Sequence, residues 1–271
     1  MIPTLCQTFR LLAFRTFDQL GRARRVEHQP LEETFTDTNI LDLKERHPTE
    51  IYSRVYNKRD EGKSGADWEW WLTNWSMTNW LGLRVQAKIL NLELDAFSHL
   101  HYKSGKSKEY QSTKLKRESA KEGLIPLYCF YVHEEPVSQG GQRWCGSFGY
   151  SPEYYGCSLA SISHIETLRT ARKDDRESVM QKTIPWHCLV CCRGYEGDDL
   201  PNRAWLLLQH RLKIAAPLIR TRDNQQAFQG KPIGPRPQAP DYVRSVIENR
   251  RPDGIPTNSR GVLVLRALQY D

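Results

Sequence analysis

The sequence predicts an α/β protein whose mixed central β-sheet is flanked by helices, with a C-terminal α/β extension. Three observations predict this class. Apolar runs of strand length recur along the chain, segments with one apolar helical face separate them, and the elements follow the order helix, strand hairpin, helix, strand, helix, strand. With 271 residues, 39% hydrophobic and 26% charged, the chain can bury a core of this kind.

The N-terminal part of the chain predicts two helices. Apolar residues recur at helical spacing over residues 5–20, and the pattern ends near Gly21. The segment LEETFTDTNILDLKERHP, residues 31–48, has a second apolar side and ends at a proline. We therefore expect an N-terminal helix within residues 1–30, followed by a core at 31–135 that opens with the second helix.

The core predicts a sheet of apolar strands. A short extended piece is expected at residues 50–57, and a helix at about 109–122 precedes the last strand. The main strands are the tryptophan-rich SGADWEWW, then WLGLRVQAKIL and LIPLYCFYV, at residues 64–71, 80–90 and 124–132. The last run is apolar almost throughout, which is typical of a buried central strand.

Residues 136–271 predict a basic extension that packs on this core. Helices are expected at residues 158–172, 201–213 and 241–250, and a linker at 229–240. The apolar runs IPWHCLVCC and GVLVLRAL, at residues 184–192 and 261–268, predict two further strands.

Two acids stand out in the tryptophan-rich strand. If the segment is extended, Ala66, Trp68 and Trp70 share one face, and Asp67 and Glu69 share the other. Like charges at this distance repel, and burying either is costly without a cation or hydrogen bonds. The pair therefore needs a compensating partner.

The neighbouring elements offer such partners. Gln86 and Lys88, two residues apart, share one face of the next strand and would converge on the two acids if the strands pair. Glu32 or Glu33 could reach the same spot from the preceding helix. Two accessory side chains lie one turn apart on the helix that follows: Gln111 and Lys114.

This order resembles the restriction-endonuclease-like PD-(D/E)XK nuclease superfamily. There, an acid on a first helix precedes an aspartate on one strand and a (D/E)-x-K motif on the next strand, and a helix follows. The matching segments here are EET, GAD and QAK, and they span roughly residues 31–132. The resemblance implies a restriction-endonuclease-like core and a metal-dependent hydrolase of phosphodiester bonds.

The resemblance also implies a role for each residue. Asp67 would be the central ligand of Mg²⁺ or Mn²⁺, and Glu33 would hold metal-bound water from the helix side. Lys88 would orient the attacking water or offset charge on the phosphate. Gln86 replaces the usual acid with a neutral amide oxygen. On charge grounds we expect Glu69 to compensate as a supplementary ligand.

A narrower resemblance concerns the segments EETFTD, GADWEWW, VQAK and PWHCLVC. Together they are similar to a family of bacterial chains associated with phage-defence loci. We therefore expect an endonuclease acting on DNA, most simply double-stranded, as an effector in bacterial antiphage defence with a defence-system partner protein. The alternative is an inactive nuclease-fold module that binds nucleic acid or another protein. Gln86 favours the module, and Lys88 favours the enzyme.

The distribution of charge agrees with a nucleic-acid partner. The net charge is +7, and residues 211–271 carry 11 basic and 5 acidic side chains, against 28 and 27 in residues 1–210. A basic surplus of this kind suits a polyanion. Arg250 and Arg251 are the candidate contacts within it.

The cysteines predict a reducing compartment. Seven cysteines is an odd number without the spacing of a secreted disulfide scaffold, and no segment reads as a signal peptide or membrane span. We therefore expect a cytoplasmic protein that does not contact a membrane.

A zinc site is the alternative interpretation of these cysteines. The candidate ligands are His187, Cys188, Cys191 and Cys192, with Cys145 and Cys157. An extended run would place Cys188 and Cys191 on opposite sides, which favours buried core cysteines over structural zinc. A nucleophilic Cys–His pair ranks lower still, because nothing in the sequence positions an oxyanion site.

Overall fold

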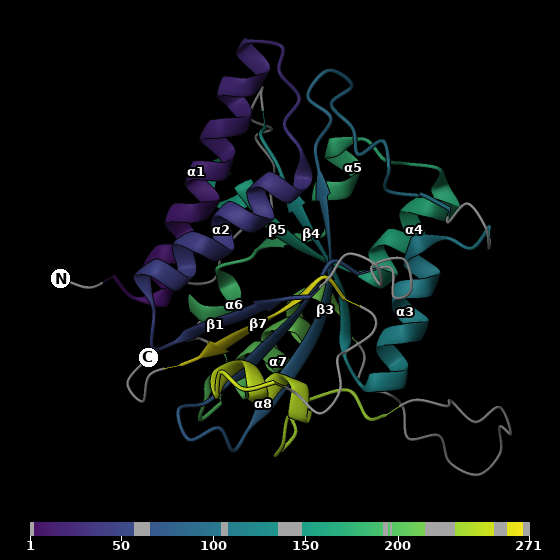
Figure 1. Ribbon diagram of the computed structural model, residues 1–271. Coiled ribbons are helices and arrows are strands. Elements are labelled where there is room, and N and C mark those ends of the chain that lie inside the picture. The colour runs from purple at the N-terminus through teal and green to yellow at the C-terminus, as the bar shows by residue number, and fades with distance from the viewer. Residues whose placement is uncertain are drawn as a thin grey trace, which may run out of the picture.

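The centre of the protein is a seven-stranded mixed β-sheet (Figure 1), in a computed structural model that describes residues 3–56, 66–103, 108–134, 148–191, 195, 197–214, 231–251 and 259–267. The strands are β1 (Ile51–Val55), β2 (Trp68–Thr73), β3 (Trp80–Ile89), β4 (Ile125–Tyr131), β5 (Cys157–Ser161), β6 (Thr183–Pro185) and β7 (Gly261–Arg266). The helices are α1 (Leu5–Arg25), α2 (Glu32–Arg46), α3 (Gln111–Glu122), α4 (Ile162–Ala171), α5 (Arg176–Met180), α6 (Cys188–Cys191), α7 (Leu200–Leu212) and α8 (Asp241–Ile247). The predicted α/β class is confirmed.

The strand order joins both halves of the chain in one sheet. It runs β1-β7-β2-β3-β4-β5-β6, in which β2 and β3 are antiparallel and β4 joins β3 in parallel after α3. The last strand, β7, lies between β1 and β2. Residues 136–271 therefore supply β5, β6 and β7 to the central sheet, whereas the sequence predicted an extension packed on the core formed by residues 31–135.

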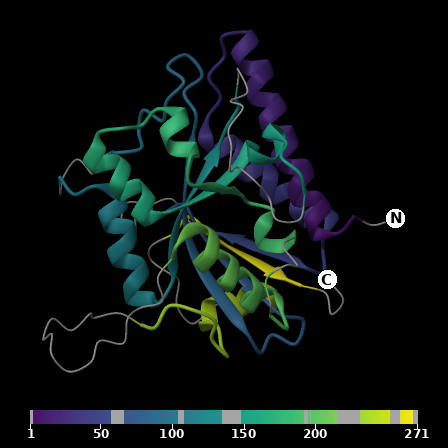
Figure 2. The ribbon, with the colours of Figure 1, turned by 180° about the vertical axis from the view of Figure 1, so that it is seen from behind.

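Helices cover both faces of the tryptophan-rich strand β2. On one face the rings of Trp70 and Trp186 lie 6.1 Å apart, and the Trp186 indole N–H donates to the Phe9 carbonyl of α1 at 2.8 Å. On the other face Trp71 packs in a cluster with Val243 of α8. Figure 1 shows α8 in front of the lower part of the sheet, and Figure 2 shows α7 over it from behind. The acid-bearing face of β2 is therefore buried as well.

Two predicted elements differ in the structure. The helix predicted at residues 158–172 begins as strand β5, whose pairing with β4 delays the start of α4 to Ile162. The run IPWHCLVCC, predicted as extended, contains β6 and then α6, where the Cys191 backbone N–H donates to the His187 carbonyl at 2.8 Å. A short apolar run suits a buried strand and a buried helix equally, so its periodicity does not separate the two.

Two of the cysteines form a disulfide, which the sequence analysis did not predict. Cys6 of α1 and Cys191 of α6 form a disulfide with Cα atoms 4.9 Å apart. Cys157 and Cys188 are buried and take no part in it, while Cys145 and Cys192, the other candidate zinc ligands, lie outside the described residues. Disulfides are rare in reducing compartments, so this pair was not expected, and the cytoplasmic location stays a prediction. None of the described helices is long and apolar enough to cross a membrane.

Candidate active site

Asp67 lies immediately before β2, where the chain joins the sheet. Its backbone N–H donates to the Val85 carbonyl at 3.0 Å. Its Oδ2 accepts hydrogen bonds from the Ala87 backbone N–H at 2.8 Å and from the Gln86 side-chain amide at 2.5 Å. The structure thus brings Asp67 and Gln86 together, and two donors of β3, one from the backbone and one from a side chain, hold the carboxylate.

The side chain of Gln86 links Asp67 to α3. Gln111, the first residue of α3, donates to Gln86 Oε1 at 2.7 Å, and Gln86 Nε2 also donates to the Ala87 carbonyl at 3.1 Å. The Gln86 oxygen therefore accepts from Gln111, whereas the sequence predicted that it would share an ion with Asp67. Lys114 is half-buried nearly one turn further along α3.

Glu32 is the helix acid that faces Asp67 and Lys88. Glu33 is exposed on the same first turn of α2, whereas Glu32 is half-buried, so the choice of Glu33 from the sequence is corrected. Burial raises the pKa of Glu32 to about 8, and the Asp67 and Glu33 carboxylates add to the rise. The Lys88 ammonium and the Ile89 backbone amide lower this pKa. A carboxyl group perturbed in this way is typical of functional sites.

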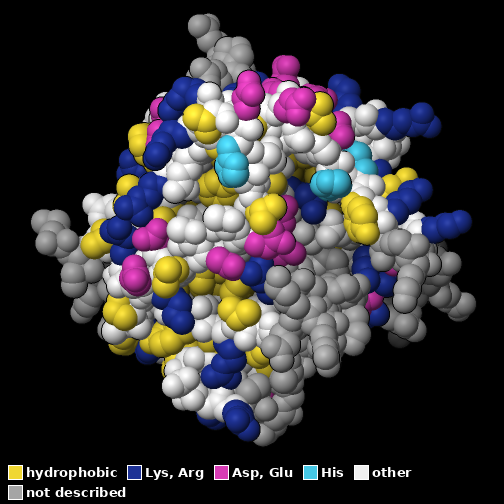
Figure 3. All heavy atoms as spheres, turned by 45° about the horizontal axis from the view of Figure 1, so that its top comes forward, with side chains coloured by type: hydrophobic (Ala, Val, Ile, Leu, Met, Phe, Trp, Pro, Cys, Tyr) yellow, Lys and Arg dark blue, Asp and Glu magenta, His cyan; other side chains and the backbone are white. Residues whose placement is uncertain are grey.

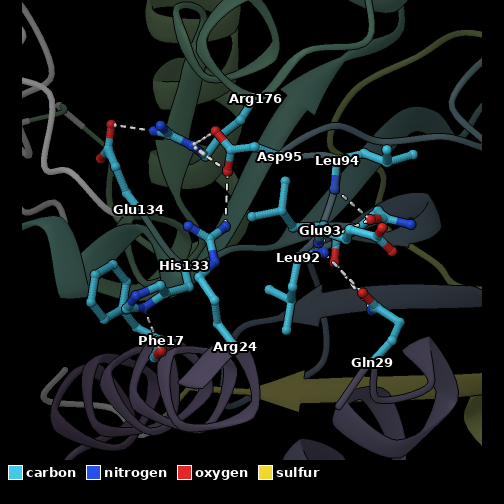
Figure 4. A network of polar contacts seen from close by, with 12 residues as sticks. Phe17, Arg24, Gln29, Leu92, Glu93, Leu94, Asp95, His133, Glu134 and Arg176 are labelled. Carbon is cyan, nitrogen blue, oxygen red and sulfur yellow. Dashed lines mark hydrogen bonds and ion pairs between the residues drawn. The ribbon is translucent and has the colours of Figure 1, made fainter. Parts of the chain in front are cut away.

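The chain that follows β3 is tied to the connection between α1 and α2, which sets where α2 begins. Gln29 of that connection accepts from the Leu92 backbone N–H at 2.9 Å. Figure 4 shows the next anchor, in which Asp95 forms ion pairs with Arg24 of α1 at 2.8 Å and Arg176 of α5 at 2.9 Å. These contacts hold the first turn of α2 beside the end of β3.

Glu69 is fully buried, and its carboxylate already has partners. Arg84, its cross-strand neighbour, pairs with Oε1 at 2.6 Å. Tyr242 of α8 donates to Oε2 at 2.6 Å, and the Trp71 indole N–H donates to the same oxygen at 3.3 Å. The protein therefore tolerates the carboxylates of Asp67 and Glu69 close together because each has its own hydrogen-bond partners. These contacts contradict the predicted role of Glu69 as a supplementary metal ligand.

Tyr128 and Arg169 adjoin the site, although the sequence analysis did not find them. Tyr128 pairs with Gln86 in the parallel β3–β4 ladder, and its hydroxyl is buried without a hydrogen-bond partner among the described residues. Burial raises the pKa of Tyr128, the Asp67 carboxylate raises it further, and the Arg169 guanidinium lowers it. The available signal was that Tyr128 lies in the strand after Gln86, but only the register shows that the two are neighbours.

Asp67 and Glu32 are the residues that could hold a divalent ion. Mg²⁺ typically takes one or two carboxylates and completes its shell with water and phosphate. Two buried oxygens nearby, Gln111 Oε1 and Tyr128 Oη, lack partners among the described residues, which fits a site that a ligand or water completes. No three His, Cys, Asp or Glu side chains in the described part of the chain are grouped to hold a metal by themselves.

The predicted DNA contacts are only partly available. Arg250 forms ion pairs with Asp241 and Glu248, which offset its charge, while Arg251 is exposed. On the face shown in Figure 3, acidic side chains gather near the centre and many basic side chains lie around them. That face is therefore of mixed sign.

The chain matches a known protein family. A family model described as "Family of unknown function (DUF6615)" matches residues 5–271. No curated protein matches the chain. The matched segment runs from α1 through β7, so it includes every described element of the site.

Proposed function

The chain belongs to the DUF6615 family, a family of unknown function, and we propose from the geometry of the site that it is a metal-dependent nuclease hydrolysing the phosphodiester bonds of DNA. The observation that carries this proposal is the convergence of Glu32, Asp67 and Lys88 from three different elements. The elements run in the order α2, β1, β2, β3, α3, so the helix acid, the aspartate, the lysine-bearing strand and the following helix keep the order expected from the resemblance to the PD-(D/E)XK superfamily.

The chemistry of these side chains suits phosphodiester hydrolysis. A divalent ion held by Asp67 and Glu32 would polarise the phosphate and supply hydroxide. Lys88, only 9% exposed at the end of β3, would stabilise the negative charge that develops on the phosphate. Gln86 keeps Asp67 in a fixed orientation.

A nuclease-fold module that binds nucleic acid without cutting it is the second candidate. The observation that favours it is the amide of Gln86, which donates to Asp67 and brings no negative charge to the site. A site with fewer negative charges binds divalent ions less tightly. A role in bacterial antiphage defence, with a partner protein and a cytoplasmic location, rests on the sequence resemblance alone and is part of the same proposal.

Cleavage of supercoiled plasmid in Mg²⁺, Mn²⁺ or EDTA tests the proposal, with linear duplex, single-stranded DNA and RNA as parallel substrates. We expect metal-dependent nicking that Lys88→Ala reduces by about 100-fold or more, because that charge acts in the transition state. Lys121→Ala is the matched control, since Lys121 is an exposed lysine paired with Glu118. DNA binding by a wild-type protein that cleaves in neither metal would favour the second candidate.

A further inference from the structure

A cavity of about 420 Å³ lies at the edge of the sheet between the start of α4, strand β6 and the end of α7. It is separated from β3 by β4 and β5 in the strand order. Its charged lining residues are all basic, namely Lys182, Arg211 and Lys213, and no described lining residue is acidic. The cavity therefore favours an anion.

The first turn of α4 faces this cavity. Ser161, the residue before the helix, accepts from the His164 backbone N–H at 3.4 Å, and its hydroxyl lies 3.0 Å from that of Ser163. All three residues line the cavity. The first backbone N–H groups of a helix have no acceptor within the helix, and its dipole favours negative charge there.

His164 gives a second and independent indication of a ligand. It lines the cavity and is only 6% exposed. Its Nε2 donates to the Val179 carbonyl at 3.0 Å, but its Nδ1 is buried without a hydrogen-bond partner among the described residues. Leaving a buried polar nitrogen unsatisfied is costly, so the ring lacks one partner that a ligand could supply.

Lys182 lies close enough to act on this ring. Burial lowers the pKa of His164 and the Lys182 ammonium lowers it further, while the Val179 and Ser178 backbone groups raise it. Arg211 and Lys213 stand at the end of α7, where a cation also interacts favourably with the helix dipole. The helix dipole does not explain the position of Lys182, because this residue precedes β6 and lies outside the helices.

We propose that this cavity binds the terminal phosphate of a small phosphomonoester, with the start of α4 and the basic side chains around the phosphate and His164 Nδ1 as a hydrogen-bond partner. Because Nε2 uses its hydrogen on Val179, Nδ1 of the neutral ring is an acceptor. The P–OH of a monoester monoanion can donate to it, whereas a phosphodiester has no such hydrogen. The cavity volume is that of a site for a sugar phosphate or mononucleotide. This site does not depend on the proposed nuclease activity.

Thermal unfolding of the full chain with inorganic phosphate or adenosine monophosphate tests the site. We expect a ligand well above its dissociation constant to raise the wild-type Tm by about 2–4 °C. Lys182→Ala/Lys213→Ala should lose this rise. The control Lys44→Ala/Lys121→Ala removes two lysines outside the cavity and should keep the rise in Tm. Because phosphate salts stabilise proteins in general, the comparison with this control separates that effect from binding in the cavity. His164→Asn should bind adenosine monophosphate more weakly than the wild type in a calorimetric titration.

Competition with short oligonucleotides tests whether the cavity recognises a terminal phosphate or the phosphodiester backbone. A short oligonucleotide with a terminal phosphate should compete with adenosine monophosphate if an end can enter the cavity, and the unphosphorylated oligonucleotide should not. Equal competition by both would overturn the proposal, because it would indicate recognition of the diester backbone. A wild type without any Tm rise at 10 mM ligand, or equal rises in the pocket and control variants, would overturn it too. If His164→Asn fails to fold, the lysine variants still test whether phosphate binds in this cavity.

Discussion

Replacing Glu32 by glutamine should stabilise the protein in alkaline but not in acidic solution. The pKa of Glu32 is about 8 in the folded protein, against 4.5 for an ordinary glutamate, because the carboxyl group is buried beside Asp67. Between these two values the unfolded chain gives up its proton while the folded protein keeps it. The stability that this proton contributes is therefore complete below pH 4.5 and is lost as the pH rises to about 8.

The size of the effect follows from the difference between the two pKa values. At about 1.4 kcal/mol per pH unit, the full difference corresponds to about 5 kcal/mol. Glu32 is half-buried and faces Lys88, so we expect roughly half of this, about 2 to 3 kcal/mol at pH 8.5. The uncharged amide of Glu32→Gln escapes this cost, which should raise the Tm by about 5 to 10 °C.

Thermal and urea unfolding between pH 5 and pH 8.5, in EDTA, measures the effect. The stability of wild type and Glu32→Gln should differ little at pH 5 and should diverge steadily above it. Glu33→Gln is the matched control, since Glu33 is the exposed neighbour on the same turn. An equal gain in Glu33→Gln, or a gain in Glu32→Gln that does not change with pH, would refute the reasoning.

Three further changes test other parts of the structure. Glu69→Gln should destabilise the protein by about 3 kcal/mol in urea unfolding, because it leaves Arg84 buried and unpaired, and a neutral result would show that the pair is dispensable. Gln86→Glu should lower the Tm in EDTA, because its carboxylate repels that of Asp67, and it should increase the rise in Tm that Mn²⁺ produces. A variant whose Tm equals that of the wild type both in EDTA and in Mn²⁺ would contradict the proposed metal site. Cys6→Ser should cost about 2 to 4 kcal/mol under oxidising conditions only. Thiol titration of the unfolded wild type should find at most five reactive cysteines of the seven in the sequence, whereas seven would exclude the disulfide.

The parts of the candidate site that depend on the alternation of side chains along a strand could be predicted from the sequence. Alternation within β3 places Gln86 and Lys88 on one face, and the acid-bearing segment before and within β2 was recognised in the same way. The partner of Glu69 could not be predicted, because Arg84 lies opposite it only in one register of the β2–β3 pair. A shift of one residue would have moved Arg84 away.

The helix phase of α2 distinguishes its first two glutamates. Glu32 precedes the buried residues Phe35 and Thr36 by three and four positions, so it shares their side of the helix. Glu33 is displaced from that side by about 100°. The phase therefore favours Glu32 as the acid that faces the sheet.

Long-range pairing explains what the sequence could not predict in the fold. β7 begins nearly 190 residues after β2 and lies between β1 and β2, a position that no local pattern specifies. The disulfide between Cys6 and Cys191 has a sequence separation of 185 and depends on the same folding of the chain. Local patterns predicted most helices and strands, but not which of them are neighbours.

The central claim is that Asp67 and Glu32 hold a divalent ion from which Glu69 is excluded. Calorimetric titration of Mn²⁺ into the wild type, Asp67→Asn and Glu69→Gln at pH 8 tests it most directly. The contacts of these residues predict that the wild type and Glu69→Gln bind the ion with similar affinity and that Asp67→Asn loses at least about tenfold. A wild type that binds no Mn²⁺ at millimolar concentration, or equal binding by all three proteins, would contradict the claim.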